Sequence, residues 1–376
     1  MQTENIADLY LRLPDQGLAA RQMDELVHYA QQIEFFHLVA AKDARVSRLR
    51  QHFAATPVAA IYLSANLEAL DFQHPGIPTA VLEKDFFHKD SAAPIEQRVK
   101  RLENTIVIIN NNDAAPKASL EGYVEVFRRS ENTIFVAWDW DNHHWLSLSC
   151  FFAAHSDVYG PSHYDNLFLL SRYNWLTVGP VHCASVQWSR RYLTEKLPMM
   201  TTIARSDEPL GRHIRYAKFP FRNQVITTVN QKCPSVNLTD HTYHGRTIED
   251  RLTEWSSHKS HWIVPVLNDI PIRVFDALMC GGVPIVPATM RFLPVLDAIA
   301  PEHIEFYGPN DIMNPQDVIA RANLKFDQGG VDGLIARHRF ALDNHHGHTR
   351  IEQLLGYVSR IVDLGTKLGG RENEHA

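Results

Sequence analysis

Two charged side chains, Arg273 and Asp276, stand three residues apart near the start of a short apolar segment. Residues at this spacing share one face of a helix. An arginine near a helix N-terminus can pair with a phosphate oxygen, because the free N–H groups there already attract anions. The nearby carboxylate can accept hydrogen bonds from a sugar diol. The pair is therefore a candidate handle for a nucleotide. The alternative is a surface salt bridge, which would contribute only about 0.2–0.5 kcal/mol.

The run that contains this pair, residues 261–287, alternates between strand and helix patterns. Such alternation is typical of a parallel α/β sheet. Ligands of these sheets bind beyond the carboxyl ends of the strands. In order, the run predicts a strand over 262–267, a turn at Asn268-Asp269-Ile270-Pro271, a helix over 272–280, the stop signal Gly281-Gly282 and a second strand over 283–287.

This run resembles the donor-binding half of GT-B-fold glycosyltransferases, particularly bacterial enzymes that build surface polysaccharides. The residues from Asp276-Ala277 to Gly281-Gly282-Val283-Pro284 are similar to the family's E-A-x-x-x-G-x-P-like run, in which an acidic residue grips the nucleotide ribose. The family's paired Glu, eight residues upstream, falls at Asn268, where this chain departs from the pattern. The similarity continues through Ile304–Ile312 and Arg337–Leu355 and covers roughly the last third of the chain.

The resemblance implies an α/β protein with two Rossmann-like domains facing a cleft. We expect an acceptor-side domain over residues 1–200, a nucleotide-sugar-binding domain over 201–368 and a flexible tail over 369–376. The implied activity moves a sugar from a nucleotide-sugar donor to a glycan or lipid-linked glycan acceptor. No divalent metal or other cofactor is expected, because arginine and a helix dipole would offset the diphosphate charge. The donor-binding residues predicted in this way are Arg212, Asn268, Asp269, Arg273, Asp276, Gly281 and Gly282.

Basic residues near the expected domain boundary are further candidates for contact with the diphosphate. They are Arg212, Arg215, Lys218 and Arg222. The alternative is that this part of the chain, residues 193–221, is a solvated linker. The basic residues Arg337 and Arg339 are instead expected to pair with acids on a helix surface.

A second candidate site follows the predicted strand that ends at Trp138. Asp141, His143 and His144 come after it, and any one of them is a candidate general base for the acceptor hydroxyl. Neighbouring residues on a strand point in opposite directions, so at most one of the two histidines is expected to act. The interleaved tryptophans Trp138, Trp140 and Trp145 would form a platform for a sugar ring.

Three alternatives stay open for this segment and for the protein. Asp139 and Asp141 match a D-x-D metal clamp, which would make the chain a metal-dependent GT-A-like transferase. The acids and histidines can also satisfy one another in a hydrogen-bonded turn. The third alternative is a non-catalytic glycan-binding protein with the same fold. Asn268, which stands in place of the family's second Glu, leaves this alternative open.

Composition narrows the class of protein further. The 376 residues suffice for two domains, and the net charge of −6 argues against a nucleic-acid binder. No apolar stretch is long enough to span a bilayer. The four cysteines lack C-x-x-C spacing, which favours reduced thiols and a cytoplasmic location. Peripheral contact with the inner face of a membrane, where a lipid-linked acceptor would lie, is compatible with this reading.

Overall fold

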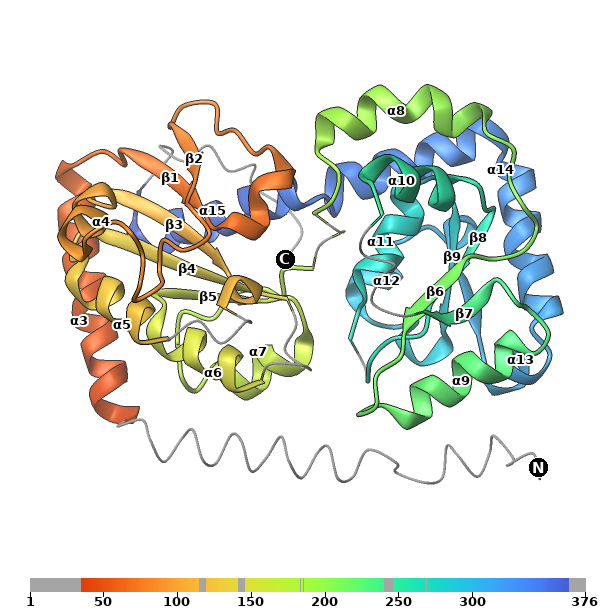
Figure 1. Cartoon of the computed structure of the whole chain (residues 1–376), viewed down its shortest axis with the longest axis horizontal. Coiled ribbons are helices and arrows are strands. Elements are labelled where there is room, and N and C mark those ends of the chain that lie inside the picture. Colours follow the sequence, from red (N-terminus) through yellow and green to blue (C-terminus); the bar gives the residue numbers. More distant parts are fainter. Residues whose placement is uncertain are drawn as a thin grey trace. The chain divides into compact units, whose positions relative to one another are not determined.

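The computed structural model describes residues 35–114, 120–140, 146–182, 184, 186–239, 246–267 and 269–364. These residues form two compact units, shown in Figure 1. The N-terminal unit comprises residues 35–189 together with 347–364, and the C-terminal unit comprises 190–346. Each unit is an α/β structure built on parallel strands.

The N-terminal unit contains one five-stranded parallel sheet in the order β2-β1-β3-β4-β5. Every residue of β3 and β4 is buried. Continuous burial is expected for the central strands of a parallel sheet that is covered on both faces. The strands are β1 (Ala60–Leu63), β2 (Thr79–Val81), β3 (Thr105–Asn110), β4 (Thr133–Asp139) and β5 (Val158–Pro161).

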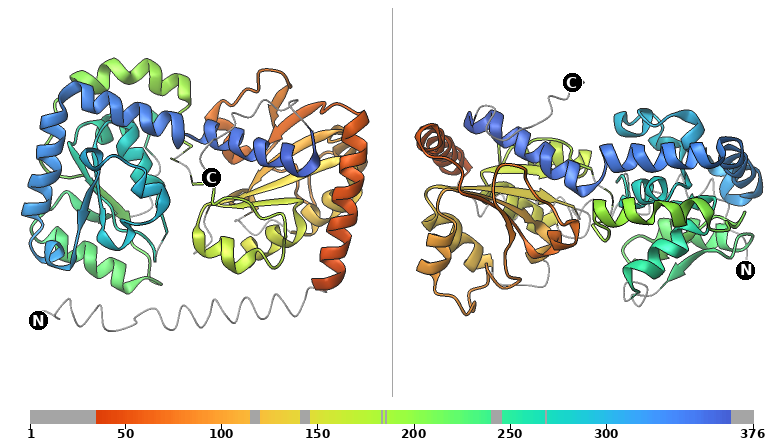
Figure 2. Two further views of the ribbon diagram at one scale, coloured as in Figure 1. Left: turned by 180° about the vertical axis from the view of Figure 1, so that it is seen from behind. Right: turned by 90° about the horizontal axis from the view of Figure 1, so that it is seen from above.

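Alternate residues of β3 and β4 point into two separate cores, one on each face of the sheet. Ile106 and Val136 pack in one core with residues of α3 and α15. Val107 and Phe135 pack in the other with residues of α5 and α6. The view from above in Figure 2 separates these two helical layers. The helices of this unit are α3 (Phe35–Ala55), η1 (Ala65–Leu70), α4 (Ile95–Arg101), η2 (Asn111–Ala114), α5 (Leu120–Arg129), α6 (Leu146–His155), α7 (Tyr164–Leu170) and α15 (Gly347–Val362).

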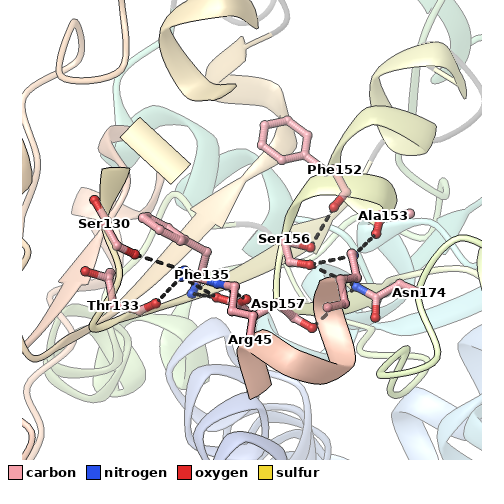
Figure 3. A network of polar contacts seen from close by, with 10 residues as sticks. Arg45, Ser130, Thr133, Phe135, Phe152, Ala153, Ser156, Asp157 and Asn174 are labelled. Carbon is pink, nitrogen blue, oxygen red and sulfur yellow. Dashed lines mark hydrogen bonds and ion pairs between the residues drawn. The ribbon is translucent and has the colours of Figure 1, made fainter. Parts of the chain in front are cut away.

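A network of polar contacts fixes α3 to the amino end of β5 (Figure 3). The Arg45 guanidinium donates to the Asp157 carboxylate at 2.6 and 3.3 Å. The Lys42 ammonium donates to the carbonyls of Ala153 and Ser156 at the end of α6, both at 2.7 Å. Burial lowers the pKa of Lys42 to about 7. Because the network lies at the amino edge of the sheet, away from the edge where such sheets bind ligands, its role is to hold the helix in place.

The C-terminal unit also has five parallel strands. Its two sheets, β10-β9-β8 and β6-β7, are joined by a parallel bridge between Leu210 and His261. The strand order is therefore β7-β6-β8-β9-β10. The strands are β6 (Gly211–Ile214), β7 (Val236–Thr239), β8 (Ser260–Trp262), β9 (Val283–Pro287) and β10 (Glu305–Tyr307).

One core of this unit packs helices against these strands. Val225, Ile226 and Val229 of α9 meet Trp262 and Ile285 there. The helices of this unit are α8 (Arg190–Thr202), α9 (Pro220–Asn230), α10 (Ile248–Ser256), α11 (Ile272–Met279), η4 (Ala288–Met290), α12 (Pro294–Asp297), η5 (Pro301–His303), α13 (Pro309–Met313) and α14 (Gln316–Asn344).

The predicted α/β class is confirmed. Two of the predicted domain boundaries differ from the boundaries of the two compact units. The segment 347–362 was expected in the C-terminal domain. It forms α15 instead, and Ile351, Leu354 and Val358 are buried in a core of the N-terminal unit. Residues 190–200, expected in the acceptor-side domain, belong to the C-terminal unit. The alternative of a solvated linker over 193–221 is wrong, because the segment contains α8, with Leu193 and Met200 buried, and β6. The expected tail, 369–376, lies outside the described residues.

Candidate functional site

The carboxyl edge of the C-terminal sheet has a topological switch point between β6 and β8. The chain leaves β6 toward β7 on one side and leaves β8 toward β9 on the other. In doubly wound sheets of this order, ligands bind just outside the strands where the direction reverses. The two segments that leave this point run from β6 into α9 and from β8 into α11.

Each of these two segments carries an arginine in the first turn of its helix. Arg222 lies near the start of α9 and Arg273 near the start of α11. Arg222 is only 3% exposed, whereas Arg273 is half-buried. Among the described residues, neither forms an ion pair with a carboxylate. Two helix N-termini and two guanidinium groups that form no ion pair among the described residues therefore lie at one sheet edge, which favours anions.

His213 of β6 completes this cluster. Its Nε2 atom donates to the Trp262 carbonyl at 3.1 Å, and its Nδ1 atom accepts from Nη2 of Arg222 at 3.3 Å. Burial, Arg273 and Arg222 together hold the pKa of His213 well below its usual range. The imidazole is therefore neutral, and Nε2 carries its proton.

Apolar contacts fix the two segments relative to each other. Phe219 and Val266 are buried together, with Tyr216 and Leu267 packed beside them. The guanidinium of Arg222 lies 5.1 Å from the centre of the Tyr216 ring. Leu267 has a φ of +55°, a left-handed conformation that is unfavourable for a leucine. Backbone strain of this kind concentrates at functional sites, so it adds to the argument from the arginines.

The far end of α11 is anchored by three side chains. Arg205 donates to the Cys280 carbonyl at 2.7 Å, Arg337 to that of Gly281 at 2.9 Å, and His338 to that of Met279 at 2.5 Å. Cations at a helix C-terminus also interact favourably with the helix dipole. The prediction that Arg337 pairs with acids on a helix surface was wrong, since Arg337 is 1% exposed.

The structure places the predicted donor-binding residue Arg212 away from the arginine pair. Its guanidinium donates to the Glu254 carboxylate of α10 at 3.1 and 3.2 Å. Arg212 and His213 are neighbours on a strand and therefore point to opposite faces. Because His213 contacts Arg222, Arg212 faces the other side. Arg222, and not Arg212, therefore lies beside His213.

The other predicted donor-binding residues follow the course of α11. Asp269 lies in the loop that precedes the helix, near enough to Arg222 to raise its pKa against the effect of burial. Asp276, in the second turn, is 3% exposed and acts electrostatically on Cys280. Its role toward a ribose stays a prediction. Asn268 lies outside the described residues.

Gly281 and Gly282 lie at the opposite end of α11 from Arg273. A Cβ atom at Gly282 would stand 2.3 Å from the His261 ring. Gly282 therefore allows close packing of α11 against β8, and Gly281 allows close packing against α14. They do not join the anionic site.

In the N-terminal unit, the candidate bases Asp141, His143 and His144 lie outside the described residues, as does Trp145. The described part of the same segment is tightly packed. Trp138 is fully buried, with its Nε1 atom donating to Val181 O at 2.9 Å, so it cannot serve as an open sugar platform.

Asp139 is the centre of a hydrogen-bonded group at the end of β4. Its Oδ1 atom accepts from Asn111 at 2.5 Å, and its Oδ2 atom accepts from Asn166 at 3.0 Å and from the Tyr159 hydroxyl. Both oxygens are thus occupied by protein donors, which argues against a metal clamp on this aspartate. Among the described residues, no group of three or more possible ligands comes together around a metal position.

Sequence reasoning singled out Arg273 but gave no role to His213. Arg222 was only one of several basic residues near an expected linker. The available signal was Pro220, because proline is typical of a first helical position, and it would have placed Arg222 in the first turn of a helix.

No protein-family model matches the chain, and a search of curated proteins finds no match. None of the described helices has both the length and the apolar character needed to cross a membrane.

Proposed function

We propose that this protein is a glycosyltransferase of GT-B type that binds a nucleotide-sugar donor at the β6/β8 switch point of its C-terminal unit. The observation that carries the proposal is the pairing of Arg222 and Arg273 at two helix starts, without carboxylate partners among the described residues. The E-A-x-x-x-G-x-P-like run from Asp276 supports the same assignment by resemblance. The finer features, two Rossmann-like domains facing a cleft, belong to this proposal.

The chemistry follows from where charge develops. As the bond between the sugar and the diphosphate breaks, negative charge grows on the leaving phosphate oxygens. Fixed donors that already face this position stabilise the transition state more than the ground state. Arg273 and the N-terminus of α11 would supply those donors, and Asp276 would accept from the ribose hydroxyls.

The N-terminal unit would present the acceptor, a glycan or a lipid-linked glycan. Asp141, His143 and His144 stay the predicted candidates for the base that removes the acceptor proton. The occupied oxygens of Asp139 favour this reading over the metal-dependent alternative. A cytoplasmic location, with contact at the inner face of a membrane, is part of the same proposal.

A thermal-shift screen of the full chain tests the proposal. The ligands are UDP, GDP, CDP, TDP and their common sugar conjugates, each with and without manganese. A ligand at 100 times its dissociation constant adds about 2.7 kcal/mol of stability. We expect one nucleotide family to stabilise the protein independently of metal, and Asp276→Ala to lose this effect. No shift with any of them would refute the donor site and favour a non-catalytic glycan-binding protein.

A further inference from the structure

The buried Arg222 donates hydrogen bonds from two of its three guanidinium nitrogens. Its Nη1 atom donates to the Ile214 carbonyl at 2.8 Å and its Nη2 atom to Nδ1 of His213 at 3.3 Å. Its Nε atom is buried and has no hydrogen-bond partner among the described residues. A buried donor without an acceptor destabilises the folded protein, because it has lost its hydrogen bond to water. An acceptor that arrives with a ligand would remove this cost.

The charges around Arg222 also favour the binding of an anion. Burial is the main cause that lowers the pKa of Arg222 to about 10, and the positive charge of Arg273 adds to it. Tyr216 and Asp269 oppose this shift only in part. A bound anion would relieve the repulsion between the two guanidinium groups and would be held by both.

His213 sets the orientation of the Arg222 guanidinium. Because Nε2 of His213 donates to the Trp262 carbonyl, Nδ1 is left as an acceptor, and Arg222 fills it. A protonated imidazole would offer no acceptor and would add a third positive charge. The buried, neutral ring therefore fixes the guanidinium plane through Nη2, while the Ile214 carbonyl fixes it through Nη1.

We propose that Arg222 is a second anion-binding residue of the donor site, whose Nε–H donates to a phosphate oxygen of a nucleoside diphosphate, and that His213 is its positioning residue. The inference rests on the proposed function, since it deepens the description of the same site. The shared chemistry is a diphosphate, so inorganic pyrophosphate is a sufficient probe, and nucleoside diphosphates report whether the base and ribose add affinity.

Isothermal titration of the full chain with pyrophosphate, UDP and GDP tests this inference. Arg222→Met should weaken diphosphate binding at least about tenfold, the loss expected for one charge-assisted hydrogen bond. Arg222→Lys keeps a charge but lacks the planar fork and should also weaken binding. The matched control is Arg339→Met, which removes an exposed cation of α14 and should leave the dissociation constant nearly unchanged.

Two substitutions separate positioning from general packing at His213. His213→Asn places an acceptor near the Nδ1 position, whereas His213→Gln places its polar group near the Nε2 position. We expect the asparagine variant to retain more diphosphate affinity than the glutamine variant. If His213 only stabilised the fold, the diphosphate affinity of each variant would follow its thermal stability, and asparagine would have no advantage over glutamine.

The possible outcomes distinguish a failure of the proposed donor site from a failure of the roles proposed for Arg222 and His213. If the unaltered protein binds neither pyrophosphate nor any nucleoside diphosphate, the proposed function itself fails. If it binds them, and Arg222→Met or a folded Arg222→Lys binds as well as Arg339→Met, only the role of Arg222 is overturned. If His213→Gln binds at least as well as His213→Asn, the positioning role of His213 is overturned. Thermal melts of each variant establish that it is folded. If Arg222→Met does not fold, the binding measured with Arg222→Lys tests the role of Arg222.

Discussion

A Cβ atom on Gly281 would lie 2.4 Å from Cγ of Leu334, so α11 and α14 pack at a distance that only glycine permits. Gly281 also has a φ of +73°, in the left-handed region that other residues rarely adopt. The helix that presents Arg273 is thus held at its far end by a backbone contact. We expect Gly281→Ala to lower the free energy of unfolding by more than the roughly 1–2 kcal/mol of left-handed strain alone, which chemical denaturation measures.

Leu334 provides the control for this substitution. In a Leu334→Ala background, the Cβ of Gly281→Ala meets neither Cγ nor Cδ2 of residue 334, so Gly281→Ala should cost less stability there than in the unaltered protein. An equal loss in the two backgrounds would contradict the packing role of Gly281.

The occupied oxygens of Asp139 give a second prediction. Replacing the carboxylate by an amide in Asp139→Asn turns one acceptor into a donor that faces protein donors. We expect a loss of about 1–3 kcal/mol in unfolding free energy. Asp165→Asn, at an exposed position of α7, should have little effect. A metal clamp would instead make manganese stabilise the unaltered protein but not Asp139→Asn, and that result would reopen the metal-dependent reading.

The half-buried Lys42 gives a prediction for how the stability of the protein depends on pH. Burial lowers its pKa from 10.5 to about 7 in the folded protein. Between these values the unfolded chain binds more protons than the folded one, so this residue makes stability rise with pH from about 7 to 10.5 and contributes no slope below pH 7. Lys42→Met should flatten this part of the curve, as measured by urea unfolding at several pH values.

An exposed lysine serves as the control for this pH dependence. Lys100→Met removes a solvated charge of α4 and should keep the slope of the unaltered protein. If Lys42→Met and Lys100→Met give the same slope, Lys42 is protonated throughout and the burial argument is wrong.

Much of the fold could be predicted because its central strands have simple patterns. Short β-branched and aromatic runs predict strands over 105–109 and 133–138, which match β3 and β4 closely, since buried parallel strands read as continuous apolar runs. The strand predicted over 283–287 matches β9, and the helix predicted over 272–280 matches α11 to within one residue. The sequence also predicts strands over 235–238 and 304–307, which overlap β7 and β10.

The elements missed by sequence reasoning owe their structure to distant partners. β6 has the sequence GRHI, which is too short and polar to be recognised alone, yet it pairs with β7 and stands beside β8. The predicted strand 262–267 matches only at Trp262, because the ladder with β9 ends there. His213 could not be assigned a role in advance, since its partners Arg222 and Trp262 are 9 and 49 residues away in the chain.

The most direct test of the donor site is a crystal structure of the full chain with the nucleoside diphosphate that stabilises it most. We expect the diphosphate at the β6/β8 switch point, with Arg273 and the first turn of α11 in contact with its oxygens. A diphosphate bound in the N-terminal unit, or anywhere else than beside Arg273, would refute the proposed donor site.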